Sequence, residues 1–190
     1  MFVIKKKYFL IIESIKDINL ERINKYNKFV IIYRNQKKIE NRLDLVKFCK
    51  SCKNKKIEFI IANNLTLAID LKADGIYLSS YNKSFNHLHK KNKNFKIIGS
   101  AHNIREINEK IKQGCEHILL SRLFLVNYKS KSDFLGINKF NKYASIFNGK
   151  LVPLGGIKIN NLNKLNSVKS KYFAILSEIK KKPAIISRLF

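Results

Sequence analysis

Eight short runs of apolar residues recur along the chain, and each run is almost continuously hydrophobic. Continuous apolar runs are typical of strands covered on both faces, as in a parallel sheet, whereas a strand with one wet face alternates apolar and polar residues. The pattern therefore predicts eight buried strands. They cover residues 8–12, 29–33, 57–61, 75–78, 96–99, 117–120, 151–154 and 172–176.

The stretches between these runs are rich in lysine and helical in their periodicity. In residues 104–111 the apolar side chains recur every three or four positions. The opposite, polar face of this helix holds Glu106, Glu109 and Lys110. Further helices are expected over residues 41–53, 65–71 and 162–168, with N-caps at Asn64, at Asn103 and at Asn160 or Asn161, and with Gly114 ending the helix over 104–111.

Alternation of strand and helix in units of about 20–25 residues is typical of a barrel closed on itself. We therefore expect one α/β domain over residues 1–190, a compact (β/α)8 TIM barrel. The last unit, residues 180–190, leaves room only for a short final helix. An open doubly wound sheet is the alternative, but eight regular units in so short a chain favour closure.

The chain carries 39 lysine and arginine residues against 13 acidic ones, a formal net charge of +26. Such a charge indicates either a field that attracts anions or a biased genome. Only six of the basic residues are arginine and 22 asparagines accompany them. Because lysine and asparagine have A/T-rich codons, genome bias explains much of the excess. A basic nucleic-acid-binding module stays open as an alternative, although no recognised nucleic-acid motif is present.

Three cysteines, an odd and small number, indicate a reducing compartment rather than a disulfide framework. Cys49 and Cys52 have the spacing of half a metal site, but they lie in the predicted helix over 41–53 and no second pair follows. The apolar run after Lys7 is too short for a signal peptide, and no stretch reaches the ~20 apolar residues of a membrane span. We expect a cytoplasmic protein with no membrane partner and leave its oligomeric state open.

In a parallel barrel the functional residues follow the strands, and phosphate is often held after the seventh and eighth. Gly155 and Gly156 follow the predicted seventh strand, where glycine lets backbone N–H groups approach an anion beside a helix start. Ser177 follows the eighth strand and adds a hydroxyl group. These residues predict a phosphate site. The alternative is a tight turn that merely needs glycine.

Two further strand ends carry candidate chemistry. The sixth strand runs into Arg122 and a long basic loop that holds Lys129, which either folds over a phosphorylated ligand or is simply solvated. The fifth strand ends near Ser100 and His102, and this histidine is either an acid–base group or a helix cap. His87 and His89 lie in a polar stretch and are expected at the surface. We find no Ser/His/Asp arrangement and no metal-ligand cluster.

An ordered set of motifs resembles the thiamine phosphate synthase/TenI family over nearly the whole chain. The segment at residues 67–78 is similar to that family's LALALGADGVHLG segment. The resemblance implies a barrel that joins a pyrimidine-methyl pyrophosphate to a thiazole phosphate and releases pyrophosphate with magnesium, or a TenI-type thiazole isomerase. The other matching segments are residues 8–13, 97–102, 135–136, 154–157 with Asn161, and 174–177.

The resemblance also implies roles for individual residues. Arg34 matches the arginine of the family's Q-x-R-x-K strand, and Lys129 is the one residue kept from its T-x-T-K loop, so these two are the candidate catalytic residues. The candidate residues for binding phosphate and substrate are Ser100, Arg122, Gly155, Gly156 and Ser177.

Several departures from the family pattern concern the metal and the chemistry. Asn63 and Asn82 stand where the family has its magnesium aspartates, so a magnesium site would be weakened and no cofactor is certain. Arg122 replaces the TenI-type histidine. Phosphorylated small molecules are the expected partners. The sequence therefore leaves three interpretations: a synthase or TenI-like enzyme with an eroded magnesium site, a catalytically degenerate barrel that binds phosphorylated ligands, and the nucleic-acid-binding module.

Overall fold

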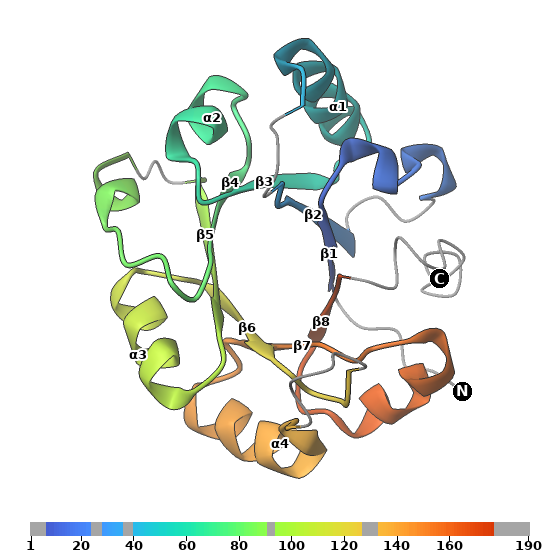
Figure 1. Cartoon of the computed structure of the whole chain (residues 1–190), viewed down its shortest axis with the longest axis vertical. Coiled ribbons are helices and arrows are strands. Elements are labelled where there is room, and N and C mark those ends of the chain that lie inside the picture. Colours follow the sequence, from blue (N-terminus) through green and yellow to red (C-terminus); the bar gives the residue numbers. More distant parts are fainter. Residues whose placement is uncertain (1–6, 24–27, 36–39, 91–93, 127–132, 177–190) are drawn as a thin grey trace.

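A closed ring of eight parallel strands forms the centre of the molecule (Figure 1). The computed structural model describes residues 7–23, 28–35, 40–90, 94–126 and 133–176. Each strand pairs with the next along the chain, and β8 pairs with β1 to close the ring, which confirms the TIM barrel and excludes the open sheet. The strands are β1 (Lys7–Ile12), β2 (Phe29–Tyr33), β3 (Glu58–Ala62), β4 (Gly75–Leu78), β5 (Lys96–Ala101), β6 (His117–Ser121), β7 (Leu151–Leu154) and β8 (Tyr172–Ile175).

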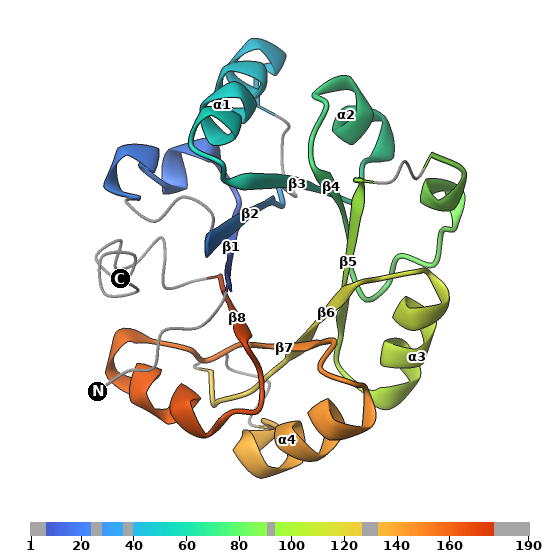
Figure 2. The same ribbon diagram turned by 180° about the vertical axis from the view of Figure 1, so that it is seen from behind.

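Helical segments surround this ring, as the views from the two poles show (Figures 1 and 2). The α-helices in the described residues are α1 (Arg42–Asn54), α2 (Leu65–Asp70), α3 (Ile104–Lys112) and α4 (Gly136–Ile146). The expectation of a regular helix in every unit is wrong, because β1, β4 and β7 are followed by 3-10 segments. These segments are η1 (Ile15–Asp17), η2 (Leu20–Arg22), η4 (Asn86–Lys90) and η5 (Ile159–Ser167). Segment η5 holds four asparagines, whose side chains compete with helical backbone bonding.

The predicted caps are correct for two helices and wrong for a third. Asn64 Oδ1 accepts a hydrogen bond from the Leu67 amide at 2.9 Å, and Asn103 Oδ1 accepts one from the Glu106 amide at 2.9 Å. The segment after β7 begins before Asn160, so neither Asn160 nor Asn161 caps it. The predicted short helix over 180–190 lies outside the described residues.

The side chains inside the barrel come from every second residue of the strands. They form a cluster separate from the larger one between the strands and the outer helices, which contains the buried Cys49 and Cys52 of α1. Alternation along β2 and β5 gives Arg34 and Ser100 the next inward positions at the C-terminal ends of those strands. The buried inner residues are Phe9, Ile11, Val30, Ile32, Ile60, Tyr77, Ile98, Leu119, Val152, Leu154 and Ala174.

Two polar residues that we expected at the surface are buried. His87 is only 2% exposed, and its Nε2 atom lies 2.8 Å from the backbone oxygen of Gln113. Lys110 is 0% exposed, although it was assigned to the polar face of its helix. Each makes hydrogen bonds to other segments of the chain, which a local pattern does not reveal. No helix in the described part of the chain could span a membrane.

Candidate functional site at the mouth of the barrel

A cavity of about 200 Å³ lies at the C-terminal ends of the strands. Arg34, Ser100, Arg122, Gly155 and Gly156 all line it, although they come from four different strand ends. The structure therefore brings five of the seven predicted site residues together. The other two, Lys129 and Ser177, lie outside the described residues.

The β2, β4 and β5 side of the cavity joins a cation to two hydroxyl groups. The Nε atom of Arg34 is buried and has no hydrogen-bond partner among the described residues. Tyr77 is 2% exposed and shares a hydrogen bond with the Ser100 hydroxyl. Burial raises the pKa of Tyr77, while the Ser100 bond and the Arg34 charge act in the opposite direction. The phenol is therefore a neutral hydroxyl beside a guanidinium group, an arrangement suited to an oxyanion.

Tyr77 is the site residue that the sequence interpretation missed. It lies inside an apolar strand, and its hydroxyl is visible as a functional group only when the strand's inward face is known. The available signal was its alternation with Ile76 and Leu78, since one residue in two of a barrel strand points inward. Ser79, two residues further on, has the same parity as Tyr77 and also lines the cavity.

The turn after β7 needs glycine at both positions. Gly155 and Gly156 have φ values of +94° and +69°, which side chains rarely adopt. A Cβ atom on Gly156 would lie 2.5 Å from the Phe124 carbonyl oxygen, because the segment after β6 crosses directly over it. A Cβ atom on Gly155 would lie 3.0 Å from Cγ of Arg122. The backbone of this turn is thus packed tightly against the segment after β6 and also lines the cavity.

Asn161 holds the same turn from behind. Its amide group donates to the Gly156 carbonyl oxygen at 2.8 Å and accepts from the Lys158 amide at 2.8 Å. The expected α-helix start after this turn is wrong, because a 3-10 segment follows it. An anion at this turn would meet local backbone N–H groups. An α-helix dipole does not contribute.

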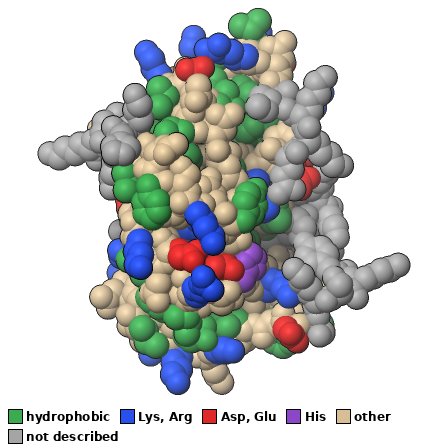
Figure 3. All heavy atoms as spheres, turned by 60° about the vertical axis from the view of Figure 1, so that its left-hand side comes forward, with side chains coloured by type: hydrophobic (Ala, Val, Ile, Leu, Met, Phe, Trp, Pro, Cys, Tyr) green, Lys and Arg blue, Asp and Glu red, His purple; other side chains and the backbone are tan. Residues whose placement is uncertain are grey.

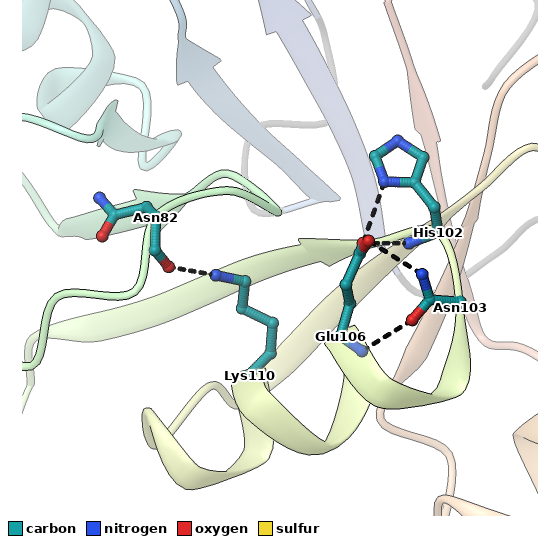
Figure 4. A network of polar contacts seen from close by, with 5 residues as sticks. All are labelled: Asn82, His102, Asn103, Glu106 and Lys110. Carbon is teal, nitrogen blue, oxygen red and sulfur yellow. Dashed lines mark hydrogen bonds and ion pairs between the residues drawn. The ribbon is translucent and has the colours of Figure 1, made fainter.

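His102, which follows β5, also lines the cavity and is oriented by Glu106 of α3. Its Nδ1 atom is 3.0 Å from Oε2 of Glu106, which also accepts the His102 backbone amide at 2.8 Å (Figure 4). Burial acts to raise the pKa of Glu106, but the hydrogen bonds from His102 and Asn103 outweigh it and lower that pKa. Glu106 therefore stays a carboxylate near neutral pH and fixes the ring of His102 at the cavity edge.

The residues at the family's metal positions do not fit a magnesium ion. Asn63 Oδ1 accepts hydrogen bonds from the Ser79 amide (3.0 Å), the Ser79 hydroxyl (3.0 Å) and Asn82 Nδ2 (3.1 Å), so its acceptor capacity is used within the protein. Asn82 Oδ1 accepts from the Ser84 amide at 2.9 Å. Magnesium prefers carboxylate oxygens that are free to coordinate. The described residues contain no group of three possible metal ligands, and no acidic residue is among those lining the cavity.

Fold and cavity together define a (β/α)8 barrel whose mouth holds a cavity lined by two arginines. A family model described as thiamine monophosphate synthase matches residues 6–179. This match covers most of the chain, and the chain belongs to that family.

Individual relatives agree with this assignment. Thiamine-phosphate synthases from two strains of Prochlorococcus marinus are 28% identical over 153 residues and 30% identical over 135 residues, covering 79% and 70% of this chain. The matches cover only 44% and 38% of those relatives, so the chain spans less than half of their length. A thiamine phosphate pyrophosphorylase structure from Pyrococcus furiosus shares the fold, with a TM-score of 0.66, 16% identity and 98% of each chain covered.

Proposed function

We propose that this protein acts in thiamine biosynthesis as a thiamine phosphate synthase/TenI-type barrel, binding the phosphorylated thiazole and pyrimidine at its mouth and coupling them with loss of pyrophosphate. The observation that carries the proposal is the meeting of Arg34, Arg122, Ser100 and the Gly155–Gly156 turn in one cavity. Membership of the thiamine monophosphate synthase family supports it.

In this proposal the side chains act on charge. The bond between the pyrimidine methylene carbon and the pyrophosphate oxygen breaks, the pyrophosphate keeps the electron pair, and the carbon bonds to the thiazole. Arg34 and Arg122 bind phosphate oxygens of both compounds and stabilise the negative charge that develops on the leaving group, because preorganised cations in a poorly solvated site need little rearrangement. Tyr77 and Ser100 donate hydrogen bonds to phosphate oxygens. Lys129 and Ser177 are proposed to join them.

The amides at Asn63 and Asn82 favour a second candidate, a barrel that binds the phosphorylated compounds without coupling them. With their oxygens bonded to neighbouring donors, these residues leave charge stabilisation to the arginines. Both candidates predict phosphate binding that does not require magnesium. They differ only in whether product forms.

Thiamine phosphate formation from both substrates, measured in EDTA and in magnesium, separates the candidates. Turnover without magnesium supports the coupling enzyme. Binding of thiazole phosphate without any product supports the binding barrel, and absence of binding overturns both. Arg42→Met is the matched control for Arg34→Met, since Arg42 is an exposed partner of Asp70 on the outer surface.

The net charge of +26 by itself does not carry a nucleic-acid function. On the face shown in Figure 3, the Lys and Arg side chains stand in separate groups among apolar and acidic ones. Nucleic-acid binding would fall steeply with salt and compete with small phosphates at the mouth. A filter-binding series in rising salt checks this alternative.

A further inference from the structure

A lysine side chain is buried completely between α3 and the segment that follows β4. Lys110 is 0% exposed, and its Nζ atom makes no ion pair among the described residues. Burying such a group is costly unless it finds good hydrogen-bond acceptors. The barrel also makes room for it, since a Cβ atom on Gly99 of β5 would lie 3.0 Å from Cδ and Cγ of Lys110.

The Nζ atom of Lys110 is held by one backbone oxygen and one side-chain oxygen. It donates to the Asn82 carbonyl oxygen at 2.6 Å (Figure 4) and to Gln113 Oε1 at 2.8 Å. Gln113 is itself buried and donates to the carbonyl oxygens of Asn82 (3.1 Å) and Ser84 (2.7 Å). Lys110 of α3 and Gln113, the residue that caps this helix, thus hold the backbone of residues 82–84 by hydrogen bonds.

Residues 82–84 directly follow residues that form part of the cavity wall. Ser79, Ser80 and Tyr81 line the cavity, and the Asn82 amide closes a turn onto the Ser79 carbonyl oxygen at 3.0 Å. The Asn82 side chain then donates to Asn63 Oδ1, at the end of β3. A continuous chain of hydrogen bonds therefore runs from α3, through residue 82, to the two strand ends at this side of the mouth.

We propose that Lys110 is a positioning residue, which with Gln113 sets the place of residues 79–82 and thereby the part of the cavity that receives the organic portion of a phosphorylated ligand. The inference rests on the proposed function for its ligand. The structural part of the inference, that Lys110 orders residues 79–84, does not depend on the proposed function. The phosphate group meets Arg34, Arg122, Tyr77, Ser100 and the Gly155–Gly156 turn instead, so the two parts of the ligand depend on different residues.

The structural half is tested by hydrogen exchange on the ligand-free full chain. Lys110→Met keeps the length and removes the donor, and Lys112→Met on the same helix is the exposed control. Exchange at residues 79–84 is expected to rise roughly tenfold in Lys110→Met only, because this segment loses the charge-assisted hydrogen bond from Lys110. Exchange at residues 155–158 is expected to stay unchanged. Equal exchange of residues 79–84 in the wild type and in Lys110→Met would overturn the proposal.

The ligand half is tested by calorimetric titration with two probes, thiazole phosphate and inorganic phosphate. Lys110→Met is expected to weaken thiazole phosphate about fivefold and to leave inorganic phosphate unchanged, a split that general destabilisation does not produce. Equal weakening of both probes, or no weakening of either, contradicts the proposal. If the wild type binds neither probe, the proposed function fails, and the exchange experiment still tests Lys110.

A second variant covers the case in which Lys110→Met does not fold. Asn82→Ala leaves the buried lysine and its backbone acceptor in place but removes the tie to Asn63. The same split between thiazole phosphate and inorganic phosphate is expected, with a smaller change. Unaltered affinity for thiazole phosphate in this variant counts against the chain of hydrogen bonds.

Discussion

The two poles of the barrel treat charged side chains in opposite ways. At the N-terminal pole, Glu58 lies between Lys7 and Lys96, and its Oε2 atom is 2.7 Å from Lys96 Nζ. At the mouth, Arg34 has a buried Nε atom without a described partner, and no acidic residue is among those lining the cavity. Cations that the fold itself neutralises serve stability, whereas cations left without a carboxylate in a cavity are suited to an external anion.

A buried histidine at the N-terminal pole is held in its uncharged form. His117 lies between Phe9 and Tyr172, with ring centroids 5.7 Å and 4.6 Å away. Burial, with help from nearby lysines, lowers the pKa of His117 to about 4. Burial acts to raise the pKa of Glu58, but its two lysine partners outweigh that effect and lower it. The charges of this pole are therefore balanced within the fold, whereas the mouth is the proposed binding site.

The largest effect is expected from Gly156→Ala at the mouth. The new Cβ atom would collide with the Phe124 carbonyl oxygen at a positive φ value, so the turn must move. We expect thiazole phosphate affinity to fall roughly 100-fold or more, as misplacement of a binding backbone does. Calorimetric titration measures it.

Gly149→Ala is the matched control, because Gly149 has a φ value of +70° but nothing within 4 Å of its would-be Cβ atom. It should cost about 1 kcal/mol of stability from backbone strain and leave the affinity unchanged. Equal affinity losses in both variants would show that the Gly155–Gly156 turn has no special place in binding.

The second effect is a pH dependence that originates at the N-terminal pole. Because the folded pKa of His117 is about 4 and its ordinary value is 6.5, the unfolded chain binds a proton first as the pH falls. Stability should therefore drop between pH 6.5 and pH 4 and be unaffected by this group above that window. From pH 7 to pH 5 the loss should be about 1.8 kcal/mol.

Urea unfolding at both pH values measures this slope, and His117→Phe should remove most of it. Because the pKa of Glu58 is lowered, its carboxylate stays ionised at both pH values and its ion pairs do not contribute to the slope. A slope that survives in His117→Phe would assign the dependence to another group.

The third effect separates the poles directly. Arg34→Met should weaken thiazole phosphate about tenfold, the usual cost of losing one charge-assisted hydrogen bond, with little loss of stability. Glu58→Gln should lower the free energy of unfolding by about 1 kcal/mol and leave affinity unchanged, because Lys7 and Lys96 lose their carboxylate. Urea unfolding and titration of both variants give the four values. If both variants changed stability and affinity by the same amounts, the two poles would not differ in role.

The smallest effect belongs to the outer surface. Arg42 and Asp70 are 3.3 Å apart with side chains 69% and 40% exposed. Such pairs contribute little, so Arg42→Met should change stability by less than about 0.5 kcal/mol and affinity not at all. A thermal melt and one titration suffice, and a large change in either would mean that surface charge contributes more than the two poles do.

The sequence predicted the strands well because a buried parallel strand has a purely local signature. All eight observed strands begin and end within two residues of the predicted ones. The general rule that barrel sites follow the strands then placed Arg34, Ser100, Arg122, Gly155 and Gly156 at one rim, where the cavity is found.

What the sequence did not reveal depends on contacts between distant segments. Lys110 looked solvated because lysine usually is, yet it lies three residues after the buried Ile107, on the same side of α3, and residue 82 accepts its hydrogen bond. His87 was misassigned for the same reason. The 3-10 segments after β1, β4 and β7 were missed because apolar spacing alone does not distinguish them from an α-helix.

Titration of thiazole phosphate into the wild-type protein and into Arg34→Met, each in EDTA and in magnesium, tests the central claim most directly. We predict that the wild type binds equally well in both buffers and that Arg34→Met binds about tenfold more weakly in both. Binding that occurs only with magnesium, or that Arg34→Met leaves intact, would contradict a mouth that holds phosphate through its own arginines.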